Sequence, residues 1–388
     1  MLTNKDIEEL IQIRRAIHRN PELGYAEFET ANLVCRNLDS LKIPYERGIA
    51  KTGIIAQLGN GNGKCIALRA DMDALPITED TNLEFSSQKA GLMHACGHDV
   101  HTTMLLGACR ILKNTSFEGK IKFIFQPSEE GVYEDEENKS GGQRIAESNV
   151  LDDVDYAMGL HVHPLLDVGI LAYTPNEALA CTNFFTINIY GKSGHAGAAP
   201  HLAIDAILIS SHLISVLNTI VSRNIDPMLA GVLSLTKING GTAPNIVADW
   251  VTIEGTVRSL NIKNYEHIMS RISTIIDGIA KTFEAKIDLK VNLFYPSLVN
   301  NSIIHNKLIP VAEKIFEEKG LVEIKPLLGG EDFAFYSQRV PSVFYFLGAK
   351  SHDGEAFFVH HPKVVFNEEC IRLGAEFLAQ SALKLLQS

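Results

Sequence analysis

The apolar runs between residues 53 and 164 constrain the fold more than any other feature of this sequence. They are short, bounded by glycine or charge, and separated in several places by helical patterns: GIIAQLG, CIALRADMD, KIKFIFQPSEEG and YAMGLHVHP. Apolar strands that alternate with helices are typical of an α/β domain with a largely parallel sheet. We expect helices over residues 4–19 and 28–41 and through TTMLLGACRILK.

The pattern changes after residue 183, where the elements follow the order β-α-β-β-α-β of a ferredoxin-like unit. Turn-forming TPN at 174–176 and YPS at 295–297 flank this region, and the α/β pattern resumes after it. A length of 388 residues suits two domains of about 100–200 residues each. We therefore expect a discontinuous α/β domain at 1–176 and 296–388, interrupted by a smaller domain at 177–295.

Composition excludes several classes of partner. The chain carries 35 Lys+Arg against 46 Asp+Glu, a net charge of −11, which argues against nucleic-acid binding. No apolar stretch approaches the roughly 18 residues of a membrane span, and the charged N-terminal segment lacks a secretory core. We expect a cytoplasmic protein with no nucleic-acid or membrane partner.

Acidic and histidine side chains follow three of the expected strands. Asp71 and Asp73 follow the second run, Glu129 and Glu130 the third, and His161 closes the fourth. Ligands of open α/β sheets bind beyond the carboxyl ends of the strands, so one cleft can collect these groups. Adjacent residues on extended backbone face opposite ways, so one glutamate can bind a metal while the other reaches a water molecule.

Cysteine and histidine cluster in MHACGHDVH at residues 93–101. Cys96 and His98 lie at a glycine turn before a helix, and with carboxylates they form a ligand set suited to Zn²⁺. A buried inert thiol is the alternative for Cys96 alone. In the HHP turn, either His360 or His361 is a candidate ligand, and local sequence does not choose between them.

Further candidates lie outside these strand ends. His195, Asn245 and Arg258 of the inserted domain are donors suited to an oxyanion or a carboxylate, although a surface salt bridge explains Arg258 equally well. GGEDF at 329–333 fits the same cleft as the strand-end acids. We expect the acidic stretch YEDEENK at 133–139 to be a solvated loop.

Together these motifs resemble the peptidase/amidohydrolase family of hippurate hydrolases, indole-acetyl-amino-acid hydrolases, aminoacylases and N-acetyl-diaminopimelate deacetylases. The resemblance runs from about residue 14 to 386 through HxNPELGY, ALRADMDALPI, MHACGHDVHTTMLLG, FQPSEEG, GLHVHP, GKSGHAGAAPH, GGTAPNIVADWVTIEGTVRSL, GGEDFAFY and HHP. It implies a dimetal-peptidase α/β catalytic domain with an inserted ferredoxin-like lid that commonly dimerises. The implied substrate is a small N-acyl amino acid, hydrolysed to a carboxylic acid and a free amino acid.

The resemblance also assigns roles to individual residues. It implies two divalent metal ions (Zn, Mn or Co), with ligands at Cys96, His98, Glu130, His161 and His360. Glu129 matches the general base, and Asp73, or less closely Asp71, matches an aspartate after the first metal-site segment. His195 matches a lid histidine that reaches the active site, often from the partner subunit, and Asn245 and Arg258 match positions that bind the substrate's carboxylate.

Three alternatives stay open at this point. Within the family, the chain could be an N-acetyl-diaminopimelate deacetylase or a small-peptide carboxypeptidase. The insert VYEDEENKS at 132–140 departs from the family pattern near the cleft, which leaves the substrate class open. Outside it, Cys96 with His98 could form a cysteine hydrolase, although residues two apart rarely bring thiolate and imidazole together. A metal-bearing binding protein without catalysis is the third.

Overall fold

A computed structural model describes all 388 residues except 1, 60, 132–134, 318–319 and 353–354. The chain divides into two compact units. The first comprises Met1–Ala178, Val299–Lys325 and Asp332–Ser388, and the second comprises Leu179–Leu298 and Pro326–Glu331. The second unit overlaps the expected insertion at 177–295, although its folding as an independent domain stays a prediction. The inclusion of Pro326–Glu331 was not expected from the sequence.

The first unit is built on an eight-stranded sheet with the order β1-β2-β4-β3-β5-β16-β6-β15. The strands are β1 Tyr45–Ile49, β2 Gly53–Gly59, β3 Cys65–Asp71, β4 Lys120–Gln126, β5 Tyr156–His163, β6 Leu171–Tyr173, β15 Leu321–Glu323 and β16 Ser342–Gly348. The four central strands β4, β3, β5 and β16 are parallel. The expected sheet, largely parallel, is confirmed in its centre, and antiparallel pairs occur where β2 meets β1 and β4 and where β6 meets β16. A three-residue turn between β1 and β2 permits only antiparallel pairing.

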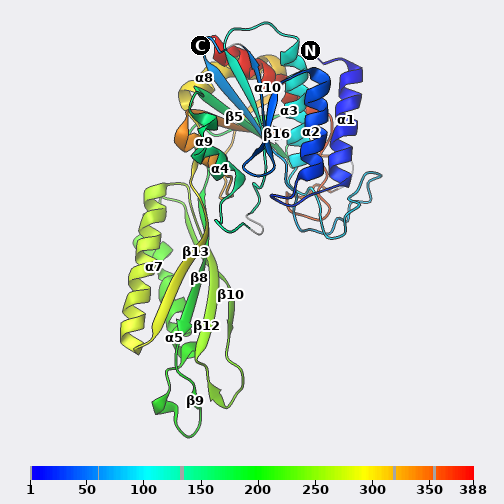
Figure 1. Cartoon of the computed structure of the whole chain (residues 1–388). Helices are drawn as coiled ribbons and strands as arrows, with labels where there is room; N and C mark the ends of the chain where they lie inside the picture. Colours follow the sequence, from blue (N-terminus) through cyan, green and yellow to red (C-terminus); the bar gives the residue numbers. More distant parts are fainter. Residues whose placement is uncertain (1, 60, 132–134, 318–319, 353–354) are drawn as a thin grey trace. The chain divides into compact units, whose positions relative to one another are not determined.

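Helices cover the sheet of the first unit. They are α1 Asn4–Arg19, α2 Phe28–Leu41, α3 His98–Lys113, α4 Gly141–Glu147, η1 Asn149–Leu151, α8 Ser302–Phe316, α9 Ala334–Arg339 and α10 Cys370–Leu386. Helix α3 packs against α1, α2 and α10, and Figure 1 shows α1, α2 and α3 side by side. Every residue of β3 and β16 is buried, as expected for central strands covered on both faces. Strands β7 Glu177–Leu179 and β14 Leu298–Val299 lie where the chain passes between the units.

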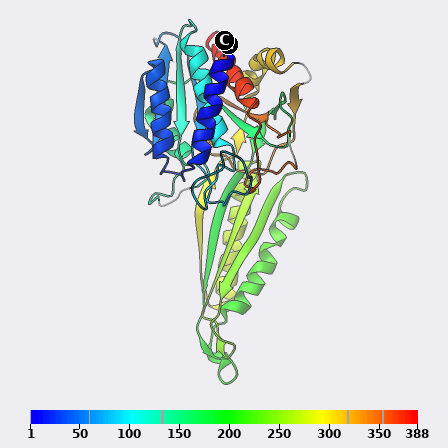
Figure 2. The ribbon, with the colours of Figure 1, turned by 90° about the vertical axis from the view of Figure 1, so that its right-hand side faces the viewer.

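The second unit is a four-stranded antiparallel sheet with the order β10-β12-β8-β13. Its elements are β8 Cys181–Tyr190, β9 Gly194–His195, η2 Pro200–Leu202, α5 Ala206–Leu217, α6 Thr219–Asn224, β10 Gly231–Gly240, β11 Ile246–Val247, β12 Trp250–Ser259, α7 Ile262–Phe283 and β13 Lys286–Tyr295. Helices α5 and α7 form a layer along one face of this sheet (Figure 2). Burial alternates along β12, whose buried side chains include Val251, Ile253 and Val257. The element order is β-α-β-β-α-β, with the helical segment after β8 divided into α5 and α6.

Within the described ranges, one helical segment, Ala206–Asn224, is long and apolar enough by composition to cross a membrane. Ile209, Leu213, Leu217 and Ile220 of this segment are buried in the core of the second unit, whereas Ile207, Leu208 and Val216 are exposed.

Candidate active site

The parallel central strands bring the predicted site residues of the first unit to one edge of the sheet. Asp71 ends β3, Glu129 follows the end of β4, and His161 lies near the end of β5. Helix α3 begins at His98, directly after Gly97, whose φ of 89° is left-handed. A Cβ on Gly97 would lie 2.3 Å from a methyl carbon of Val162, so glycine is required at this turn.

Three groups of potential ligands lie together at this edge, each with its ligand atoms within 4.8 Å of one another. They are Cys96–His98–His161, Cys96–Glu130–His360 and His98–Glu129–Glu130. The structure thus brings together all five side chains predicted as ligands, together with Glu129. We call these six residues the metal cluster.

The imidazoles of the metal cluster are oriented as metal ligands require. Nδ1 of His98 lies 3.1 Å from Oδ1 of Asp73, and its buried Nε2 has no hydrogen-bond partner within the described residues. Nδ1 of His161 donates to the carbonyl of Val162 at 2.7 Å, and its Nε2 lies 3.3 Å from Sγ of Cys96. A ring whose Nδ1 is held by an oxygen presents Nε2 to a cation. The donor set therefore fits a divalent metal ion.

The charges of the metal cluster favour a cation as well. Burial, and then the carboxylates of Glu130 and Glu129, raise the pKa of the Cys96 thiol well above its usual range. The pKa of His98 rises to about 10, because the carboxylates of Asp71 and Asp73 outweigh the opposing effect of burial. A metal ion would stabilise the thiolate that these carboxylates oppose.

The alternative of a cysteine nucleophile, in which Cys96 acts with His98, gains no support from the hydrogen bonds of Cys96. The imidazole in contact with Cys96 belongs to His161, whereas the sequence pairs Cys96 with His98. A thiol whose pKa is raised by burial and by neighbouring carboxylates supplies little thiolate for attack.

The predicted base Glu129 is held by residues that sequence reasoning did not single out for this purpose. Its Oε1 accepts a hydrogen bond of 3.2 Å from the backbone N–H of Asp332, in the GGEDF motif. The Asp332 carboxylate pairs with the guanidinium of Arg69 at 2.7 Å and accepts from Gln126 at 2.8 Å. All these groups are buried. The glycines and acids of GGEDF were the only sequence signal for this contact.

Asp71 and His101 lie beside His98 of the metal cluster and contact each other. Nδ1 of His101 lies 2.6 Å from Oδ1 of Asp71, and its Nε2 accepts the backbone N–H of Val162 at 2.9 Å. Both ring nitrogens are therefore engaged. The contact with His101 links Asp71, at the end of β3, to helix α3. Asp71 also pairs with Arg69 of its own strand at 2.6 Å.

In the second unit, His195 and Asn245 lie on adjoining segments. Strands β9 and β11 pair antiparallel, and the N–H of Ala196 donates to the carbonyl of Asn245 at 3.1 Å. Nδ1 of His195 accepts from the backbone N–H groups of Gly197 and Ala198, at 3.2 and 3.1 Å. The ring proton therefore resides on Nε2, which makes the exposed His195 a hydrogen-bond donor.

Arg258 does not join His195 and Asn245. Figure 1 shows β9 at one end of the sheet, near the start of β12, whereas Arg258 is the ninth residue of β12. The eight steps along the extended strand from Trp250 to Arg258 span roughly 26 Å at about 3.3 Å per residue. The guanidinium lies 5.4 Å from the ring centroid of Phe184. It forms no ion pair with any residue that the structure describes, so the salt-bridge alternative fails there.

The acidic insert is only partly a solvated loop. Residues 132–134 lie outside the described residues, and 136–138 are exposed. Asp135, in contrast, pairs with Lys51 at 2.5 Å and with Arg144 at 2.7 Å, and its side chain is 1% exposed. The prediction of a solvated loop is therefore wrong for Asp135, because two cations fix its carboxylate.

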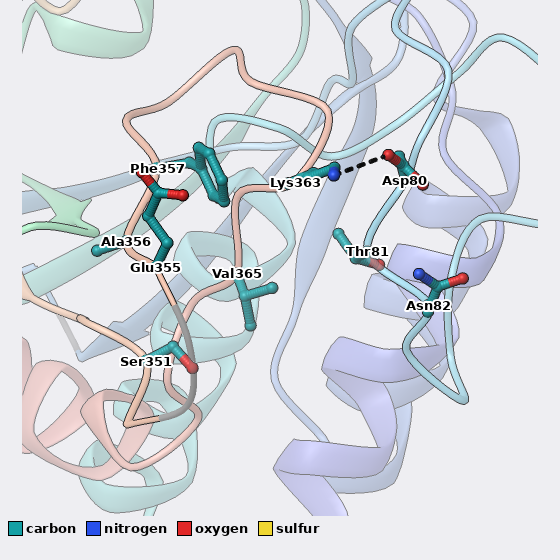
Figure 3. A pocket seen from close by; sticks show the side chains of 9 residues that line it. All are labelled: Asp80, Thr81, Asn82, Ser351, Glu355, Ala356, Phe357, Lys363 and Val365. Atoms are coloured by element: carbon teal, nitrogen blue, oxygen red, sulfur yellow. Dashed lines mark ion pairs between the residues drawn. The ribbon is translucent and has the colours of Figure 1, made fainter.

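A separate pocket of about 260 Å³ lies between residues 80–82 and the segment from Ser351 to Val365 (Figure 3). Its lining includes Phe357 and an ion pair of 3.3 Å between Lys363 and Asp80. None of its lining residues belongs to the metal cluster.

Comparison with known proteins places this architecture among enzymes. The model of peptidase family M20/M25/M40 matches residues 67–384. The chain is 40% identical over 385 residues to an IAA-amino acid hydrolase (ILR1-like 5) of Arabidopsis thaliana, covering 97% of this chain and 86% of the relative. It is 38% identical to the N-acetyl-L-cysteine deacetylase of Bacillus subtilis, covering 98% and 89%. The crystal structure of the Bacillus subtilis YXEP protein, described as a dinuclear metal binding peptidase, matches with a TM-score of 0.84, 31% identity and full coverage of both chains.

Proposed function

Because the chain belongs to peptidase family M20/M25/M40, we propose that it hydrolyses the amide bond of N-acyl amino acids to a carboxylic acid and a free amino acid. Family membership confirms the resemblance drawn from the motifs, and with it the enzyme class, a metal-dependent amide hydrolase. The observation that carries the proposal is the convergence of Cys96, His98, Glu130, His161 and His360 beside Glu129. The names of the relatives support an N-acyl amino acid as the substrate class.

We assign the metal cluster two divalent cations. Cys96, His98, Glu130, His161 and His360 would hold them. When bound, the cations would polarise the scissile carbonyl and lower the pKa of the attacking water. The ligand set suits Zn, Mn or Co.

The protein's own side chains would transfer the proton of the attacking water and stabilise the negative charge of the oxyanion. Glu129 takes the proton of the attacking water and returns it to the leaving amine. His195 donates from Nε2 to the oxyanion, and Arg258 binds the carboxylate of the substrate together with Asn245, which lies beside His195 and would come with it from the partner subunit. Asp73 orients His98 through Nδ1.

We further propose a homodimer formed through the second unit, which acts as a lid. His195 and Arg258 lie at different ends of one sheet, too far apart to touch the same small substrate from one subunit. If His195 comes from the partner subunit, His195 and Arg258 can contact the same substrate. The edge strand β10 exposes Ile238 (52%) and α5 exposes Ile207 (52%), surfaces that pairing would cover.

A cytoplasmic location completes the proposal. All six cysteines are free and buried, which suits a reducing compartment. The acidic net charge of −11 supports the absence of a nucleic-acid partner.

Amine release from a panel of N-acyl amino acids tests the reaction class. The panel contains hippurate, N-acetylcysteine, N-acetyl-diaminopimelate, indole-acetyl conjugates and short peptides, each with added Zn²⁺, Mn²⁺ or Co²⁺ and again after chelation. Activity that chelation removes and metal restores supports the proposal, and the best substrate identifies the acyl group. Activity that survives thorough chelation would favour the cysteine hydrolase instead.

A further inference from the structure

The backbone at Ser128, directly before Glu129, adopts an unusual conformation. Its φ is +50°, in the left-handed region that residues with a Cβ seldom occupy. The residue is buried. Such a conformation persists only where surrounding contacts hold it in place.

Glu27 supplies one of the contacts that hold this turn, beside the hydrogen bond from the Ser128 hydroxyl to the carbonyl of Gly131 and the bond from the Gly141 N–H to the carbonyl of Ser128. Its carboxylate is buried, and Oε1 accepts the backbone N–H of Ser128 at 2.8 Å. The other oxygen accepts the hydroxyl of Thr52 at 2.5 Å. Gly24 lies against the same turn, where a Cβ would come within 2.5 Å of the Ser128 hydroxyl oxygen. Glu27 and the preceding HxNPELGY motif thus pack onto the turn that precedes the two glutamates.

The turn at Ser128 sets the direction in which the next two residues leave β4. After it, the backbone N–H of Glu130 donates to Oδ2 of Asp73 at 2.9 Å. The side chain of Glu129 reaches the backbone N–H of Asp332 at 3.2 Å. The segment is therefore fixed at Ser128, Glu129 and Glu130 by three separate parts of the chain.

We propose that Glu27 is a positioning residue for Glu129, holding Ser128 in its left-handed conformation so that the base points into the metal cluster. This inference rests on the proposed function. Glu27 itself touches neither substrate nor ligand in this role. It acts through one backbone hydrogen bond.

The same motif offers a matched control in Glu22. This carboxylate is also buried, but it accepts from the backbone N–H groups of Glu29 and Thr30, at 3.1 and 2.9 Å, at the start of α2. Loss of Glu22 should therefore weaken the helix start and leave Ser128 unaffected. A general effect of removing a buried acid would appear in both variants.

Steady-state kinetics separate positioning from stability. We expect Glu27→Ala to lower kcat on the order of 10–100-fold with KM within about twofold, because a displaced base slows the proton transfer and not the binding. Glu27→Gln keeps an oxygen for the Ser128 N–H and should retain most of the activity. Glu22→Ala should keep kcat. If Glu27→Ala does not fold, Glu27→Asp, which withdraws the carboxylate by one methylene, takes its place.

Hydrogen exchange of the peptide covering residues 126–131 supplies a readout that needs no substrate. Faster exchange there in Glu27→Ala, but not in Glu22→Ala, is expected. Glycine adopts positive φ freely, so Ser128→Gly combined with Glu27→Ala should recover kcat to within about threefold of Ser128→Gly alone. Unchanged exchange in Glu27→Ala, or equal losses of kcat in both alanine variants, would overturn the inference. If the wild-type protein hydrolyses nothing in the panel, the proposed function fails, and the exchange data alone decide the role of Glu27.

Discussion

The Nδ1 atom of His98 lies 3.1 Å from Oδ1 of Asp73. The second oxygen of this buried carboxylate accepts the backbone N–H of Glu130 at 2.9 Å. One side chain two residues after the end of β3 therefore orients two predicted ligands, one at the start of α3 and one after β4. Asp73 is thus a supporting residue of the proposed metal centre.

Replacing this support should weaken metal binding. We expect Asp73→Asn to reduce the affinity for Zn²⁺ about 10–100-fold, because the neutral amide holds the His98 ring less firmly and lowers its basicity. Competition with a chromogenic chelator measures the affinity. Asp80→Asn is the control, since Asp80 forms an exposed ion pair with Lys363 outside the cluster. Equal affinities in Asp73→Asn and the wild type would contradict this role.

Glu129→Gln should abolish most turnover while leaving metal content intact. The amide cannot accept the water proton, and general-base catalysis contributes about 10²–10⁴-fold. Elemental analysis of the purified variant checks the metal, and amine release checks the rate. Glu136→Gln, in the exposed part of the insert, should behave as the wild type. Turnover retained by Glu129→Gln would reject Glu129 as the base.

Arg69→Met should destabilise the first unit strongly. Arg69 is buried and pairs with Asp71 at 2.6 Å and with Asp332 at 2.7 Å, so its loss removes the guanidinium from two buried carboxylates and leaves Asp71 with its histidine partners alone. Breaking a buried pair in this way costs about 3–5 kcal/mol in free energy of unfolding. Urea unfolding measures the change. Arg339→Met, which removes an exposed pair with Asp152, should cost less than about 1 kcal/mol.

The sequence predicted that the six residues of the metal cluster would lie together because they stand in local patterns, whereas their roles as ligands and base stay predictions. Cys96 and His98 share the turn before α3, whereas Glu129 and Glu130 are adjacent and follow the end of β4, where a parallel sheet collects side chains. The choice of His360 over His361 came from the resemblance. The structure places His360 Nε2 3.0 Å from Glu130 Oε1, in agreement with that choice.

The supporting contacts were not predictable in the same way. Glu27 reaches Ser128 and Asp332 reaches Glu129 across gaps of 101 and 203 residues, and no local periodicity records such pairs. The separation of Arg258 from His195 was also missed. It depends on strand register, which the order of motifs along the chain does not contain.

The pKa of Glu27 predicts a pH dependence of stability. Burial, and then the charge of Asp73, raise this pKa to about 8 from an ordinary 4.5. Between these values the folded protein keeps a proton that the unfolded chain has lost, so the free energy of unfolding should fall as pH rises. The side chain of Glu27→Gln does not titrate, so in this variant the free energy of unfolding should fall less steeply between these pH values.

Urea unfolding at several pH values between 5 and 8 measures the difference between Glu27→Gln and the wild type. The matched control is Asp135→Asn. Burial opposes the shift of Asp135, but hydrogen bonds from the backbone of Lys139 and from Lys51 and Arg144 lower its pKa, and no histidine is among these partners. The difference in free energy of unfolding between this control and the wild type should therefore stay constant above about pH 5.5. A constant difference for Glu27→Gln as well would show that Glu27 does not titrate in this range.

The distance between His195 and Arg258 predicts complementation between subunits. If His195 serves the partner's metal cluster, His195→Ala and Glu129→Gln should each lower kcat, by about 10²–10³-fold for the lost oxyanion donor. A mixed dimer of the two variants would still contain one intact site, built from the Glu129 of one subunit and the His195 of the other. Co-expression with two different affinity tags isolates this mixed dimer, and we expect about half of the wild-type kcat per dimer. If His195 acted within its own subunit, both sites of the mixed dimer would be defective and activity would stay at the level of the single variants. A monomer in size-exclusion chromatography would remove the partner contribution altogether.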